Sequence, residues 1–185
     1  MDNKLFRFIL AGLAIVVIIS AVARLFIGPQ LPKSDYNLWQ GIRPGYSSVE
    51  DLNKQFGTPA TEQKIEGGSV FEYQSDFPAI PHQVVADQNQ VVLFVKEFVP
   101  LEEGVFLAQY SQNLGGVDLV LRDQASSDAL RAHVYLEKGL VLLAHQQNGL
   151  IEQRWYFVPT TREIFLSSWG RSLTSEEYRE QLPLP

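Results

Sequence analysis

The chain has 185 residues, of which 45% are hydrophobic and 19% are charged, and these proportions exclude a disordered chain. The formal net charge is −6, and Lys and Arg are not clustered along the sequence. This charge distribution excludes a typical nucleic-acid-binding protein, which needs a basic surface. The lack of cysteine excludes disulfides, thiolate metal sites and cysteine nucleophiles.

An apolar segment at residues 5–27 predicts one membrane-spanning helix, between an N-terminal flank at 1–4 and a linker at 28–40. At about 1.5 Å per residue the segment is roughly 34 Å long, which matches a hydrocarbon core of about 30 Å. Arg7 and Arg24 would then lie near the two membrane interfaces. We therefore expect a single-pass membrane protein that contacts the membrane through this helix and whose folded domain is extracytoplasmic.

The same segment is also compatible with a cleaved signal peptide. Lys4 and Arg7 would form its basic start, residues 8–20 its apolar core, and Ala21-Val22-Ala23 a cleavage site of small residues. In that case the protein is secreted after cleavage.

An internal repeat follows. Residues 84–100 align without gaps to residues 143–159 at an offset of 59, with identities that include a shared Phe-Val-Pro at the end of each segment. Further upstream the match continues at an offset of 58, where Val49 corresponds to Leu107 and Gly57 to Gly115. Self-similarity of this size predicts two copies of one supersecondary unit. We place the first unit at 41–100, the second at 101–159, and a C-terminal helical segment at 160–185.

Each unit has the pattern of a helix followed by antiparallel strands. Ser47 and Glu50 have the spacing of a capping box, and Gly57 is suited to end the helix that they begin. A hairpin is expected around Gly67-Gly68, because glycine tolerates the backbone of a tight turn. A second hairpin is expected between strands at 83–86 and 91–98.

The second unit is expected to begin with a helix near residues 104–114. A last helix is expected near 161–169, and a further capped helix begins at Thr174. The predicted fold class is α+β, with an N-terminal transmembrane helix followed by two tandem helix-plus-antiparallel-sheet units. The strands of the second unit are expected at 117–122, 133–137, 140–145 and 150–158.

The first predicted helix carries a family resemblance. The run from Gly45 to Leu52, followed by Phe56-Gly57-Thr58-Pro59, resembles the signature of the small lipoprotein of the outer-membrane β-barrel assembly machinery and its SmpA/OmlA-like relatives. The tandem arrangement resembles the β-lactamase-inhibitor protein. Both families are non-enzymatic and bind other proteins, so the resemblance implies an interaction module. The chain departs from the lipoprotein pattern because it has no cysteine to acylate.

The sequence contains no recognisable catalytic or metal-binding motif, so we predict no catalytic residue, no metal site and no cofactor. His82, His133 and His145 lack the spacings of a metal site, and partly exposed strand and loop histidines are the simpler interpretation. Ser167-Ser168 lacks the glycines of a nucleophile elbow. A hydrolase with unrecognised catalytic residues would need His133 or His145 beside a buried carboxylate.

A loop in the first unit is a candidate interaction site. Between matched positions the first unit is three residues longer than the second, so the segment 76–82 looks inserted in one copy. Loops on rigid scaffolds often carry function, and prolines reduce the entropy lost on binding. The alternative is that its apolar residues cap the core. The candidate residues are Phe77, Pro78, Ile80 and Pro81, with Trp39, which stands in an otherwise polar stretch.

These features lead to two hypotheses about function. The first is a membrane-anchored, non-enzymatic protein-interaction or scaffolding domain at the cell envelope, whose partner is another envelope protein. The second is a secreted or tethered inhibitor or small-ligand-sensing domain of β-lactamase-inhibitor-like architecture. The second hypothesis predicts a concave sheet surface with exposed aromatic side chains.

Overall fold

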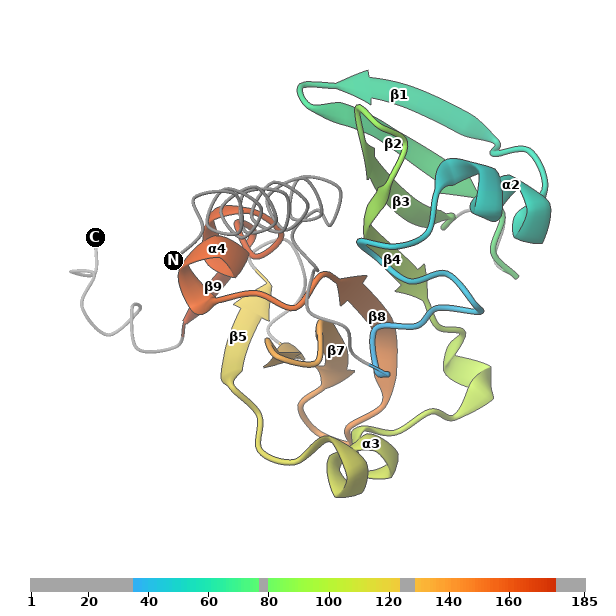
Figure 1. The fold of residues 1–185 in the computed structure, drawn as a ribbon. Coiled ribbons are helices and arrows are strands. Elements are labelled where there is room, and N and C mark those ends of the chain that lie inside the picture. Colours follow the sequence, from blue (N-terminus) through green and yellow to red (C-terminus); the bar gives the residue numbers. More distant parts are fainter. Residues whose placement is uncertain (1–34, 77–79, 124–128, 176–185) are drawn as a thin grey trace, which may run out of the picture. The chain divides into compact units, whose positions relative to one another are not determined.

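A computed structural model describes residues 35–76, 80–123 and 129–175 (Figure 1). Within these ranges the chain forms three short α-helices, α2 (Val49–Phe56), α3 (Leu107–Leu114) and α4 (Arg162–Ser167), and a 3-10 turn η1 (Leu101–Glu103). The remaining elements are strands β1 (Thr61–Ile65), β2 (Gly68–Tyr73), β3 (His82–Asp87), β4 (Val92–Phe98), β5 (Leu119–Asp123), β6 (Leu130–Tyr135), β7 (Leu140–His145), β8 (Ile151–Phe157) and β9 (Leu173–Ser175).

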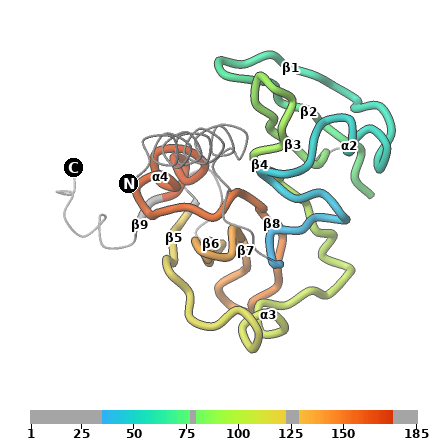
Figure 2. Tube along the Cα trace, in the orientation of Figure 1, coloured from blue at the N-terminus to red at the C-terminus, as the bar shows by residue number. Residues whose placement is uncertain are grey.

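The nine described strands form one antiparallel sheet in the order β1-β2-β3-β4-β8-β7-β6-β5-β9. We call the segment from α2 to β4 the first repeat and the segment from α3 to β8 the second repeat. Their last strands, β4 and β8, pair at the centre of the sheet, where both lie in Figure 2. Lys96 faces Trp155 in this pairing, and these two residues are also equivalent at the offset of 59. A local two-fold relation between the repeats therefore passes through this pair.

The sequence offset has a counterpart in backbone hydrogen bonds. The Val49 N–H at the start of α2 donates to the carbonyl oxygen of Gln90 at 2.9 Å. At the equivalent place in the second repeat, the Leu107 N–H donates to the carbonyl oxygen of Gly149 at 2.8 Å. In both repeats the helix is thus fixed to the turn that joins the last two strands.

The predicted fold class needs correction. The described chain is mainly one antiparallel sheet, and its α-helices span eight, eight and six residues. The sheet dominates because β4 and β8 join the strands of both repeats edge to edge, so the repeats do not form separate helix-and-sheet units.

The predicted transmembrane, single-pass organisation is corrected as well. In the part of the chain that the structure describes, no helix is long and apolar enough to cross a membrane. The expected span at residues 5–27 lies outside the described residues.

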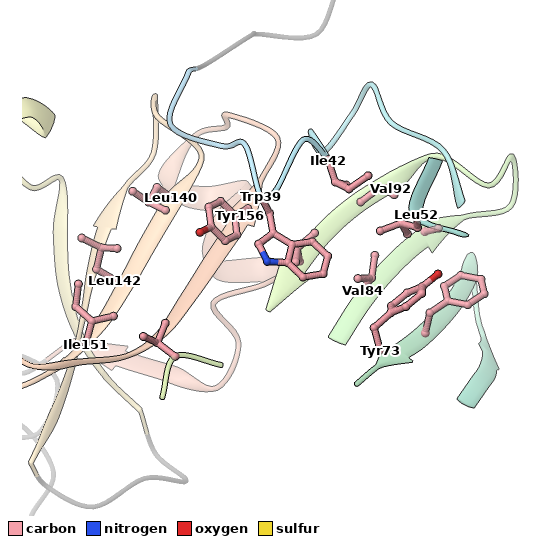
Figure 3. Close-up of a cluster of buried hydrophobic side chains, with 14 of the residues drawn as sticks. Trp39, Ile42, Leu52, Tyr73, Val84, Val92, Leu140, Leu142, Ile151 and Tyr156 are labelled. Carbon is pink, nitrogen blue, oxygen red and sulfur yellow. The ribbon is translucent and has the colours of Figure 1, made fainter. Parts of the chain in front are cut away.

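Two apolar clusters lie on opposite faces of the sheet. The first cluster holds α2 and α3 against both repeats, through buried residues such as Leu52, Val84 and Leu142 (Figure 3). The second cluster holds α4 against the second repeat, where Phe165 is fully buried. Strand β7 is covered on both faces, since residues 140–144 are all buried. Burial of apolar side chains on two faces is the main stabilising contribution to such a sheet.

The start of α2 differs by one residue from the prediction. Ser48 is the N-cap, because its Oγ accepts the Asp51 N–H at 3.2 Å while the Ser48 N–H donates to Asp51 Oδ2 at 2.8 Å. The hydroxyl of Ser47 instead accepts the Arg43 N–H at 2.9 Å. The end of the chain also differs, since Thr174 lies in β9 and does not begin a helix.

Replacing Ser48 with Ala is expected to lower the free energy of unfolding by about 1 kcal/mol, because an orphan amide at the helix start loses its acceptor. Chemical denaturation of the Ser48→Ala and Ser47→Ala variants measures the difference. A larger loss for Ser47→Ala than for Ser48→Ala would contradict the assignment of the cap.

Candidate functional site

A buried charged group lies where the two repeats meet. Glu97 on β4 has a side chain that is 7% exposed and faces Arg154 on β8. Arg154 Nη2 donates to Glu97 Oε1 at 3.0 Å, and Arg154 Nε lies 2.6 Å from Glu97 Oε2 without the alignment of a hydrogen bond. The Tyr156 hydroxyl donates to Glu97 Oε2 at 2.7 Å. The carboxylate is therefore compensated on both oxygens by the second repeat.

The same arginine also ties α3 to the sheet. Arg154 Nη1 donates to the hydroxyl oxygen of Tyr110 at 2.8 Å, and Tyr110 packs at the edge of the first apolar cluster. We call Glu97, Arg154, Tyr156 and Tyr110 the junction network. It links β4, β8 and α3 by hydrogen bonds and one ion pair.

Burial and charge act together on the ionisation of this network. Burial raises the pKa of Tyr156 well above its usual range, and the Glu97 carboxylate adds to the effect. For Arg154, burial disfavours the charged guanidinium, yet Tyr156 and Glu97 outweigh it and raise the pKa. Tyr156 is therefore a neutral hydrogen-bond donor and Arg154 a permanent cation at neutral pH.

His82 lies beside the junction network on β3. Burial lowers its pKa, although the negative charges of Glu97 and Asp76 act in the opposite sense. Its Nδ1 accepts the Phe98 N–H at 3.2 Å, which requires an unprotonated Nδ1. His82 is thus a neutral imidazole that satisfies a backbone donor near the end of β4.

The other two histidines differ in their surroundings. His145 Nε2 lies 3.4 Å from Glu152 Oε2, but the Glu152 side chain is 26% exposed. Burial lowers the pKa of His133. Across residues 35–76, 80–123 and 129–175, no group of three or more His, Asp or Glu is placed to hold a metal ion.

Trp39 lies in the core. Its side chain is 1% exposed, stacks on Phe56 at 4.4 Å between ring centroids, and meets His82 edge-on at 5.4 Å. Figure 3 shows it between Tyr156 of the second repeat and Val84 of the first. Trp39 therefore belongs to the packing between the repeats and does not line a surface.

The candidate loop is described in part. Ile80 is 46% exposed, and its carbonyl oxygen accepts the Ser75 hydroxyl at 2.7 Å, which closes the loop between β2 and β3. Pro81 is half-buried. Phe77 and Pro78 lie outside the described residues.

The two repeats differ in how fully their sheet is covered. On the face that α4 covers in the second repeat, Val85 and Phe94 are the only described residues of the first repeat that belong to the second cluster. We call the rest of this face on β1–β4 the open face. Two hydrogen bonds cross it, from Thr61 Oγ1 to Glu72 Oε2 at 2.8 Å and from Gln83 Nε2 to Glu72 Oε1 at 3.3 Å. Its side chains are Thr61, Gln63, Ile65, Val70, Glu72, Gln83, Lys96 and Phe98.

The junction network is not predicted by any motif in the sequence. Glu97 stands in a strand whose only other charged residue is Lys96, and it is equivalent to Tyr156 at the offset of 59. Its partner Arg154 is 57 residues away, and the pairing follows from the register of β4 with β8.

No family model and no curated protein matches the sequence. Among solved structures, the crystal structure of a DUF4309 family protein, YjgB from Bacillus subtilis, is similar to this chain. The two sequences are 16% identical, and the match covers 64% of this chain and 83% of the other with a TM-score of 0.48. The resemblance to SmpA/OmlA-like lipoproteins and to the β-lactamase-inhibitor protein stays a prediction.

Proposed function

We propose that this chain is a non-enzymatic protein-binding domain that binds its partner on the open face of the first repeat. The observation that carries the proposal is the unequal covering of the two repeats. The second repeat is covered on one face by the first cluster and on the other by α4, whereas the first repeat has one face without a described helix on it.

The composition of the open face fits a protein partner. It combines the half-buried apolar side chain of Val70 with the polar Glu72, Gln83 and Lys96. Non-obligate protein interfaces have this mixed character and are about as apolar as ordinary surface. The regular strands hold the side chains in place, so little conformational entropy is lost when a partner binds.

The proposed binding surface also includes the loop between β2 and β3. It connects two strands of the open face, and Ile80 is exposed at its end. The junction network supports the binding surface without contacting the partner, because its side chains are paired with one another and hold β4 in place. That the partner is an envelope protein, and that this chain is located at the cell envelope, are predictions from the sequence.

Photocrosslinking from the open face tests the proposal. A photoreactive residue at Gln83 in the full-length chain, expressed in its native cells, is expected to give one discrete adduct. The same residue at Gln146, exposed in the β7–β8 turn, is the control and is expected to give none. Equal labelling at both positions, or no adduct at Gln83, would contradict the proposed surface.

A charge placed on the open face should block binding. We expect Val70→Arg to weaken formation of the Gln83 adduct by at least about tenfold, because interface hot spots contribute more than 1 kcal/mol each. Val120→Arg, which changes a 41% exposed valine on β5, is the matched control and should leave the adduct unchanged. Ile80→Ser should reduce the adduct without lowering Tm if the loop contributes to binding.

A further inference from the structure

The outer edge of β1 has no strand beside it among the described residues. β1 pairs with β2 on one side, and all five of its residues are exposed. An edge strand presents unpaired backbone N–H and C=O groups that can accept another strand. Thr61 to Ile65 therefore form a backbone docking edge of full strand length.

The second repeat shows what such an edge can accept. Its equivalent strand, β5, is 58 residues later in the sequence and pairs with β9 on its outer side. β9 is antiparallel to β5 and covers Leu121–Asp123, which correspond to Gln63–Ile65 of β1. The same place in the duplicated sheet thus already accommodates an added antiparallel strand.

The charges along β1 favour a particular partner. Glu62 and Lys64 flank Gln63, and both project to the face of the sheet that carries α2. In an antiparallel pair of two β1 strands centred on Gln63, Glu62 of each copy stands opposite Lys64 of the other. Opposite charges directly across a ladder stabilise it, whereas like charges destabilise it. Registers centred on Glu62 or on Lys64 would place like charges face to face.

The geometry points to a homodimer in which β1 pairs with β1 of a second copy, with Gln63 on the two-fold axis. Within one chain, Lys64 Nζ already contacts Glu62 Oε1 at 2.5 Å and the Ser69 hydroxyl at 3.0 Å. In the dimer these residues form a quartet of alternating charge. An isologous contact of this kind closes on itself, so it gives a dimer and no filament.

Cysteine cross-linking tests the register. The sequence has no natural cysteine, so any disulfide must form between the introduced residues. In the proposed register the two Gln63 side chains are about 5 Å apart, within reach of a disulfide after small adjustments. The two Thr61 side chains are offset by four residues, or about 13 Å along the strand. We expect full-length Gln63→Cys to form a disulfide dimer at least about tenfold faster than Thr61→Cys. Equal rates for the two variants would overturn the register.

Charge reversal tests the pairing itself. In sedimentation experiments over a range of concentrations, the wild-type chain should dimerise, while Glu62→Lys and Lys64→Glu should each remain monomeric. The double variant Glu62→Lys/Lys64→Glu should dimerise again, because its charges are complementary in the same register. A monomeric wild type, or dimerisation that is the same in all four proteins, would overturn the proposal. The dimer goes beyond the proposed partner binding, and the Gln83 adduct reports on that binding separately.

Discussion

Replacing Trp39 with Ala is expected to lower the free energy of unfolding by about 3–5 kcal/mol, the range for removing a large buried aromatic side chain. Trp39 is 1% exposed and contacts α2 through Phe56 and β3 through His82. It also belongs to the cluster that includes Leu140 and Tyr156 of the second repeat. Its loss leaves a cavity between the repeats that the surrounding strands cannot close without losing their pairing.

Trp39→Phe is the matched control. The indole Nε1 is buried and has no hydrogen-bond partner among the described residues, so removing that N–H removes a desolvation cost and partly offsets the smaller ring. We expect Trp39→Phe to lose less than half as much stability as Trp39→Ala. Urea denaturation followed by circular dichroism measures both variants. A loss below about 1 kcal/mol for Trp39→Ala, accompanied by loss of the Gln83 adduct, would show that Trp39 acts at a surface.

Removing the charge of Glu97 is expected to destabilise the protein by about 3 kcal/mol, because Glu97→Gln leaves the guanidinium of Arg154 buried without its counter-ion. The Arg154 side chain is 20% exposed, so water compensates the charge in part and the effect lies at the low end for broken buried pairs. Tyr156 also loses a charged acceptor for its hydroxyl. Urea denaturation of wild type and variant provides the measurement.

A triple variant separates the cost of an uncompensated charge from the net contribution of the junction network. Glu97→Met/Arg154→Leu/Tyr156→Phe replaces three members with apolar side chains and leaves no buried charge among them. Exchange of a buried ion pair for apolar residues is often neutral, so the triple variant should be more stable than Glu97→Gln. If the triple variant is the less stable of the two, the interactions within the network outweigh the cost of burying its charges, and the network contributes net stability.

Local features of the fold could be predicted from the sequence because they depend on neighbouring residues. The hairpin expected around Gly67-Gly68 is confirmed between β1 and β2, and Gly67 has a φ of 86° that glycine adopts without strain. The end of α2 at Gly57 is confirmed as well, with a φ of 78°. The predicted N-cap of α2 was wrong by one residue, because the Ser47 hydroxyl accepts a hydrogen bond from the preceding turn while Ser48 caps the helix.

The candidate site was less predictable. Trp39 stands in a polar stretch of sequence, which suggested a surface position, but a tight turn closed by hydrogen bonds between Trp39 and Ile42 directs the indole into the core. Glu97 is a charged residue in a mainly apolar strand, and its burial depends on Arg154, a residue in the other repeat. Nothing in the local sequence of β4 indicates that a guanidinium will lie opposite.

By itself the sequence determined the repeat, its offset, most strand positions and the main tight turns, since these rest on side-chain periodicity and on backbone preferences of single residues. The tertiary structure alone decided that β4 and β8 pair, that all described strands share one sheet, and that no described helix covers one face of the first repeat. Every strand edge carries the same backbone donors and acceptors, so the alternation of side chains does not say which edges meet. That choice depends on long-range packing around Trp39 and on the compensation of Glu97 by Arg154.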